Sequence, residues 1–105
     1  LKKYNVLNKV KKIENYFARN LPRFHKYNFV KATRYIGAIA VIELNDMNKI
    51  KLNWLRKEYI NRGVWARPLR NVIYFMPPFI IKKNQLDKIF NTTLDIFDLW
   101  KKQNT

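Results

Sequence analysis

The pattern of apolar and polar residues divides the chain into helical and extended segments. Near the start, apolar residues recur at helical spacing between lysines, at Val6, Val10, Ile13 and Phe17. This spacing predicts an amphipathic helix over residues 3–20. Pro22 is expected to end the helix, because proline lacks the backbone N–H that a helix interior needs. Residues 23–28 are polar, and we expect them to be irregular.

From residue 30 to residue 44 the pattern changes to a nearly continuous apolar run, which predicts one strand buried on both faces. Gly37 within it indicates a β-bulge or a close approach of another backbone. Asn45 and Asp46 end the strand and can cap the helix that follows. We expect that helix to end at Gly63, since glycine readily adopts the left-handed conformation at a helix C-terminus. Its predicted inward stripe consists of Ile50, Trp54, Leu55 and Tyr59.

The last third of the chain predicts a hairpin and a helix. Residues 64–67 and 72–76 are short extended segments around a Pro- and Asn-containing turn at residues 68–71. Asn84 with Asp87 resembles a capping box at the start of the terminal helix. The whole order is helix, strand, helix, strand, strand, helix. It predicts an α+β fold in which three helices cover a small sheet of three strands, as one domain.

The formal net charge of +15 raises the hypothesis of nucleic-acid binding, because basic domains attract phosphate. The lysines are spread along the whole chain, however, and in the helical stretches they fall mostly opposite the apolar stripe, as on a solvated face. We therefore expect nucleic acid not to be a partner, and we keep a basic binding or docking module without catalytic role as the alternative function. No apolar run approaches the roughly 20 residues of a membrane span, so no membrane partner is expected.

The residue types present restrict the chemistry of the chain. It has no cysteine, which excludes disulfides and thiolate–metal sites, and its single histidine, His25, is expected on the surface. No nucleophile with a base and an orienting group can be assembled. No lysine stands in the apolar setting that activates its amine. We therefore expect no catalytic, cofactor-binding or metal-binding residue in this chain.

Arg67 and Tyr74 are the candidates for ligand binding, because both lie on or beside an otherwise apolar hairpin. Arginine offers a planar fork that grips a carboxylate through two hydrogen bonds. Tyrosine offers a hydroxyl on an apolar ring and can position the edge of a ligand. The alternative is that Arg67 makes a structural ion pair and Tyr74 packs in the core, and spacing alone favours that alternative. The tryptophans are expected to be packing residues: Trp54, Trp65 and Trp100.

Two segments carry a resemblance to a known family. Residues 63–68 read Gly-Val-Trp-Ala-Arg-Pro and residues 73–80 read Ile-Tyr-Phe-Met-Pro-Pro-Phe-Ile. They resemble the C-terminal region of the adenosylmethionine-8-amino-7-oxononanoate aminotransferases (diaminopelargonic acid synthases), which belong to the class III aminotransferases. Upstream, residues 30–43 are similar to that family's Val-x-x-Val-Arg-x-x-Gly-Ala-Ile-Gly-Val-x-Glu, in the same order and at a similar separation. Three positions depart from the family pattern but stay apolar: Ala40, Leu69 and Phe79.

The resemblance implies a PLP-dependent enzyme of fold type I that works as a cytoplasmic homodimer. It transfers an amino group from S-adenosylmethionine to a small-molecule acceptor, 8-amino-7-oxononanoate, in biotin biosynthesis. The resemblance further implies that Arg67 binds the carboxylate of this acceptor and that Tyr74 lines the same site. Trp65 and Pro68 are expected to lie next to these two side chains and to hold them in position.

By the same resemblance, residues 1–105 are expected to be the C-terminal small domain. The large domain of the enzyme, its expected partner, would hold pyridoxal 5'-phosphate. This chain alone is then expected to bind no PLP and to be inactive. A stand-alone product of a split gene, which docks onto a separately encoded large domain, is a further possibility.

Overall fold

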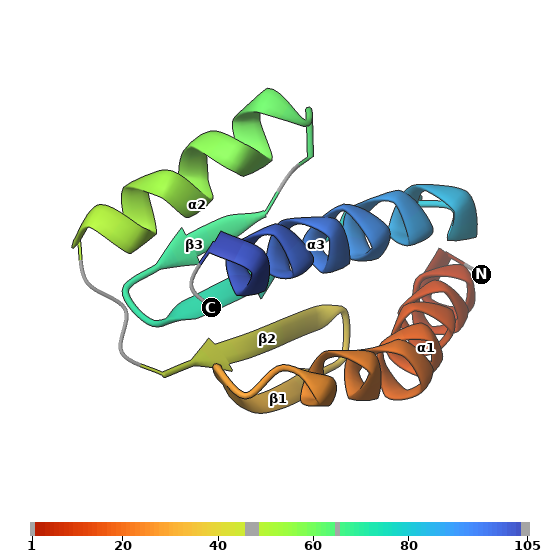
Figure 1. The fold of residues 1–105 in the computed structure, drawn as a ribbon. Coiled ribbons are helices and arrows are strands. Elements are labelled where there is room, and N and C mark those ends of the chain that lie inside the picture. Colours follow the sequence, from red (N-terminus) through yellow and green to blue (C-terminus); the bar gives the residue numbers. More distant parts are fainter. Residues whose placement is uncertain (1, 46–48, 65, 104–105) are drawn as a thin grey trace.

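The computed structural model describes residues 2–45, 49–64 and 66–103, and it forms one layer of strands and one of helices (Figure 1). The strands make a single antiparallel sheet in the order β1-β2-β4-β3. They are β1 (Val30–Ile36), β2 (Ile39–Leu44), β3 (Arg67–Leu69) and β4 (Val72–Phe75). The predicted α+β class is confirmed, with four strands in the sheet where three were expected.

The fourth strand arises because residues 30–44 form a hairpin and not one long strand. Gly37 lies in the turn with φ +55°, which glycine adopts without the steric cost of a Cβ. Its backbone N–H donates a hydrogen bond of 3.0 Å to the carboxylate of Glu14 on the first helix. The bulge expected at Gly37 is therefore wrong, and the register shifts instead between Val30 and Ala32. Burial on both faces is wrong as well, since Ile36 on the edge strand is 77% exposed.

The helices are α1 (Lys2–Asn20), α2 (Lys49–Asn61) and α3 (Lys83–Gln103). The first ends where predicted, but the chain continues as a 3-10 helix over Leu21–Lys26 and is not irregular there. Pro22 fits this helix because its missing N–H falls at a helix start, where no partner is required. Three features predicted for the first two helices lie outside the described residues: Asp46 and the side chains of Val6 and Ile50.

The second helix ends at the predicted glycine. Gly63 has φ +68°. The Val64 N–H donates to the Tyr59 carbonyl and the Gly63 N–H to the Ile60 carbonyl, each at 3.1 Å. These two bonds form a Schellman motif, which satisfies carbonyls that a helix end otherwise leaves without partners.

An aromatic cluster joins the two layers. Phe90 of α3 is fully buried, and its ring centroid lies between 5.2 and 5.9 Å from four other rings. They are the rings of Tyr16, Phe17, Phe24 and Phe75. Because these residues come from α1, the 3-10 helix and β4, one side chain links the helix layer to the sheet.

The start of α3 differs from the predicted capping box. The Gln85 side-chain oxygen accepts a hydrogen bond of 2.9 Å from the Lys82 backbone N–H, which makes Gln85 and not Asp87 the capping acceptor. Asp87 instead accepts a hydrogen bond of 2.6 Å from the Tyr16 hydroxyl. Tyr16, which is distant in sequence, thus binds the carboxylate that the local pattern had assigned to the helix cap.

Candidate functional site

The sheet has one face against α3 and one face turned away from it. On the two central strands, β2 and β4, alternate residues are buried against the helices. They are Ala40, Ile42, Leu44, Ile73 and Phe75. The residues between them point to the other face. We call this second surface the open face; it carries Val41, Arg67, Leu69, Val72 and Tyr74, all exposed or half-buried.

Arg67 and Tyr74 are direct neighbours across β3 and β4. Residues in this relation have Cβ atoms about 4.5–5.5 Å apart, so both side chains leave the open face side by side. Arg67 is exposed and Tyr74 half-buried, so neither is a core residue. A turn of two residues, Arg70 with φ +56° and Asn71, joins the strands, and it is shorter than the predicted turn at 68–71. The structure therefore brings the two predicted site residues together.

A hollow of about 710 Å³ lies beside this pair. Much of its wall is apolar, with Ile39, Leu69 and Met76 among the lining residues. Its charged lining residues are Arg56 and Arg67, and none of the described lining residues is acidic. The volume lies in the range of about 300–1,000 Å³ that is typical of small-molecule sites. Such a hollow suits an anion with an apolar body.

Arg56 is a site residue that the sequence did not single out. Its Nε donates a hydrogen bond of 3.3 Å to the carbonyl of Pro68, which fixes α2 against β3. Arg56 lies three and four residues before Tyr59 and Ile60, so all three share one helix face and line the hollow. Pro68, one of the two residues expected to support the site, is buried and accepts this bond. The other, Trp65, lies outside the described residues.

A second arginine of the open face is already engaged. Arg34 lies in the same cross-strand row, paired with Val41, which in turn pairs with Tyr74. Its guanidinium donates a hydrogen bond of 2.9 Å to Glu43, and Lys31 lies 3.6 Å from the same carboxylate. The hydrogen bond from Arg34 holds the pKa of Glu43 below its ordinary value. Arg34 is thus neutralised by Glu43 within the sheet.

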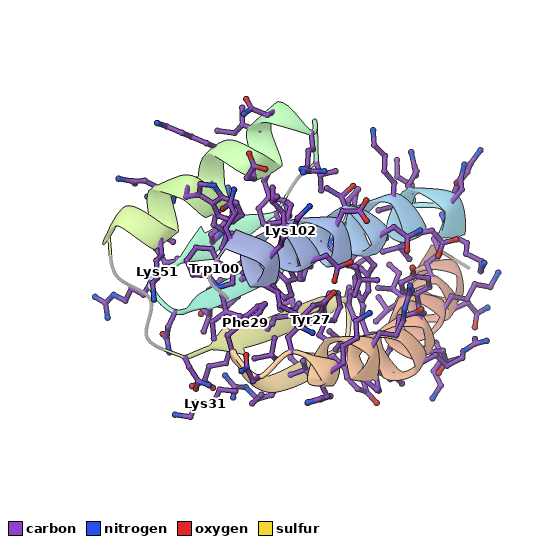
Figure 2. All side chains as sticks on the ribbon, viewed as in Figure 1. Tyr27, Phe29, Lys31, Lys51, Trp100 and Lys102 are labelled. Carbon is purple, nitrogen blue, oxygen red and sulfur yellow. The ribbon has the colours of Figure 1, made fainter. Side chains whose placement is uncertain are left out.

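The lysines of the described residues do not fit a pyridoxal phosphate site. A lysine that carries this cofactor needs a desolvated setting. Among the described side chains every lysine is exposed except Lys51, which is half-buried. Lys51 lies beside Trp100 (Figure 2). The Nζ of Lys51 is 5.5 Å from the centroid of the Trp100 ring. The Trp54 ring packs at 5.3 Å on Trp100, which confirms both tryptophans as packing residues.

The described part of the chain contains no group of three His, Cys, Asp or Glu residues that could hold a metal ion. None of its helices is both long and apolar enough to cross a membrane. His25 is exposed, as predicted, with its Nε2 2.8 Å from the Thr33 hydroxyl.

Solved structures of transaminases share this arrangement of helices and strands. One, titled "Transaminase with L-ala", superimposes on 99% of the chain with a TM-score of 0.81 at 20% identity, and the match covers 27% of that protein. The ornithine aminotransferase of Toxoplasma gondii covers 97% of the chain with a TM-score of 0.79 at 18% identity, over 25% of its own length. At these identities the likeness establishes the fold, which is one found in aminotransferases. The family model described as Aminotransferase class-III matches residues 1–97, and the chain belongs to this family.

Several individually named aminotransferases are also similar to the chain. The adenosylmethionine-8-amino-7-oxononanoate aminotransferase of Saccharomyces cerevisiae is 31% identical over 99 residues, covering 88% of this chain and 20% of the yeast protein. The enzyme of the same name from Buchnera aphidicola of Acyrthosiphon pisum is 34% identical over 89 residues, 85% of this chain and 19% of its own. An acetylornithine aminotransferase of Methanocaldococcus jannaschii is 32% identical over 83% of the chain. The predicted family resemblance is confirmed, and the chain spans about a fifth of the length of these relatives.

Proposed function

We propose that residues 1–105 are the C-terminal small-domain part of an aminotransferase that transfers an amino group from S-adenosylmethionine to 8-amino-7-oxononanoate in biotin biosynthesis. The observation that carries this proposal is the pairing of Arg67 and Tyr74 on the open face, beside a hollow with two arginines and no acidic lining residue among those described. The relatives that are named for this reaction support the choice of substrate. Family membership favours this enzyme role over a basic docking module.

The acceptor named in this reaction is a nine-carbon acid, and the hollow offers a complement to its carboxylate and to its hydrocarbon chain. The guanidinium of Arg67 binds the carboxylate with two parallel hydrogen bonds, a geometry that lysine cannot reproduce. The apolar wall, which includes Ile39 and Leu69, contacts the hydrocarbon chain and excludes water from it. Tyr74 presents its ring edge and hydroxyl to the same ligand.

The rest of the reaction requires residues beyond these 105. In this enzyme class pyridoxal phosphate supplies the electron sink, and the protein positions it. The described lysines do not fit that role, so in this proposal a large domain holds the cofactor, and this chain alone is inactive. As in the family it resembles, the complete enzyme would act as a cytoplasmic homodimer. Whether the large domain lies on the same polypeptide or on a separate one can be read from the adjacent reading frame.

The proposal is tested with the complete protein that carries this chain. The Arg67→Ala variant should raise KM for the carboxylate-bearing acceptor by about 10–150-fold, since a hydrogen-bonded charge contributes about 1.5–3 kcal/mol. The KM for S-adenosylmethionine should change far less. Arg62→Gln is the control, because Arg62 is exposed just after α2, pairs with Glu58 and does not line the hollow.

The Arg67→Lys variant separates the geometry of the clamp from its charge. It keeps the positive charge but loses the planar fork, so an intermediate rise in the acceptor KM is expected. An acceptor KM that stays unchanged in Arg67→Ala would show that Arg67 has a structural role, and the proposed clamp would have to be abandoned.

A further inference from the structure

A second groove, of about 530 Å³, lies between α1 and the start of α3. Five of its lining residues are cationic, and none of the described lining residues is acidic. They are Lys9, Lys12, Arg19, Lys82 and Lys83. We call this feature the basic groove. It shares no lining residue with the hollow beside Arg67, so it is a separate site from the one proposed for the acceptor.

Most cations of the basic groove have no ion-pair partner among the described residues. In the described part of the chain, four of them form no ion pair: Lys9, Lys12, Arg19 and Lys82. Lys83 pairs with Asp87 at 3.3 Å. Asp87 is itself occupied by the Tyr16 hydroxyl at 2.6 Å, and this hydrogen bond keeps its pKa below the ordinary value. Asp87 is therefore held by Tyr16 and Lys83, and no ion pair among the described residues offsets the other four positive charges.

The cations are also arranged in a way that costs the free protein energy. Lys9, Lys12 and Arg19 lie on one face of α1 at spacings of three and seven residues, so the two lysines repel each other. Lys82 and Lys83 lie at the N-terminal end of α3, where the helix dipole disfavours positive charge. A bound anion would relieve both interactions at once.

The chemistry of the groove fits phosphate. Four of its five cations are lysines, which bind phosphate oxygens as point charges. Several charges along a groove of this volume match a chain of linked phosphates better than a single phosphate. Phe79, 46% exposed, lines the same groove and offers an aromatic face on which a base can stack.

We propose that the basic groove binds a multivalent phosphate anion, either an inorganic polyphosphate or the phosphate chain of a nucleotide. The test is isothermal titration of the chain with sodium tripolyphosphate, ATP and adenosine at constant ionic strength. Tripolyphosphate and ATP should bind saturably at one site, and adenosine should not bind. Tighter binding of ATP than of tripolyphosphate would identify a nucleotide as the ligand, and equal binding would identify the polyphosphate chain alone.

Two double variants with the same loss of charge separate the groove from the overall positive charge. Lys9→Gln with Lys12→Gln should weaken tripolyphosphate binding by about tenfold or more. Lys57→Gln with Lys101→Gln removes two exposed lysines outside the groove and should leave binding within about twofold. All four side chains are exposed, so both variants should keep the far-UV circular dichroism of the parent. No saturable binding, or equal weakening by both variants, would overturn the proposal.

Discussion

Replacement of Phe90 by alanine tests whether the aromatic cluster holds the two layers together. The Phe90 side chain is fully buried and contacts rings from α1, the 3-10 helix and β4. Substitutions of buried phenylalanine by alanine cost about 3–5 kcal/mol, because they lose transfer free energy and leave a cavity. A domain of this size has a total stability of about 5–15 kcal/mol, so Phe90→Ala should remove a large part of it.

The assay is urea unfolding followed by far-UV circular dichroism. With a slope of about 1–3 kcal/mol per M, the midpoint should fall by about 1 M or more. Phe79→Ala is the matched control, since Phe79 is 46% exposed and should cost less than about 1 kcal/mol. If Phe90→Ala leaves too little folded protein to measure, Phe90→Leu keeps more of the volume and should show a smaller loss in the same direction. A loss for Phe90→Ala no larger than that for Phe79→Ala would refute the role assigned to the cluster.

Two further predictions concern buried and paired polar groups. Thr93→Val should destabilise the fold by about 1–3 kcal/mol in urea unfolding. The cause is the Tyr59 hydroxyl, which is fully buried, lies 2.8 Å from the Thr93 hydroxyl and would lose this partner. A loss under about 0.5 kcal/mol would mean that water reaches the Tyr59 hydroxyl. The hydrogen bond from the Tyr16 hydroxyl lowers the pKa of Asp87 in the folded state below the unfolded value of about 4. The contribution of Asp87 to folding stability is therefore present above about pH 4 and is lost as the pH falls further. The difference in urea midpoint between the parent and Asp87→Asn should therefore be largest at pH 7 and shrink below pH 4; a difference independent of pH would contradict this.

Local patterns predicted the helices well but could not assign the strands correctly. The stripe of α1 and the glycine at the end of α2 lie where expected, because helix periodicity and C-terminal glycines act within a few residues. The hairpin at Gly37 was missed because both of its strands are apolar. An apolar run without polar punctuation does not show whether it continues or reverses. The hydrogen bond from Gly37 to Glu14, which anchors the turn, joins residues that are 23 positions apart.

The same limit applied to the candidate site. Arg67 and Tyr74 could be singled out from the sequence because each is a polar group in an apolar hairpin, and the register then placed them side by side. Arg56 could not be found in this way, since its place at the hollow depends on how α2 packs against β3. Asp87 was assigned to a helix cap, and only the approach of α1 gives it the Tyr16 hydroxyl as a partner. Contacts between distant segments decide these details, and a single sequence does not show them.

The most direct test of the proposed function is a crystal structure of the complete protein with pyridoxal phosphate and 8-amino-7-oxononanoate. Our account predicts that the open face, with the hollow beside Arg67 and Tyr74, faces the cofactor. It also predicts that two of the three guanidinium nitrogens of Arg67 lie about 2.7–2.9 Å from the oxygens of the acceptor carboxylate. A carboxylate bound by other residues, with Arg67 turned away from it or facing solvent, would contradict the account.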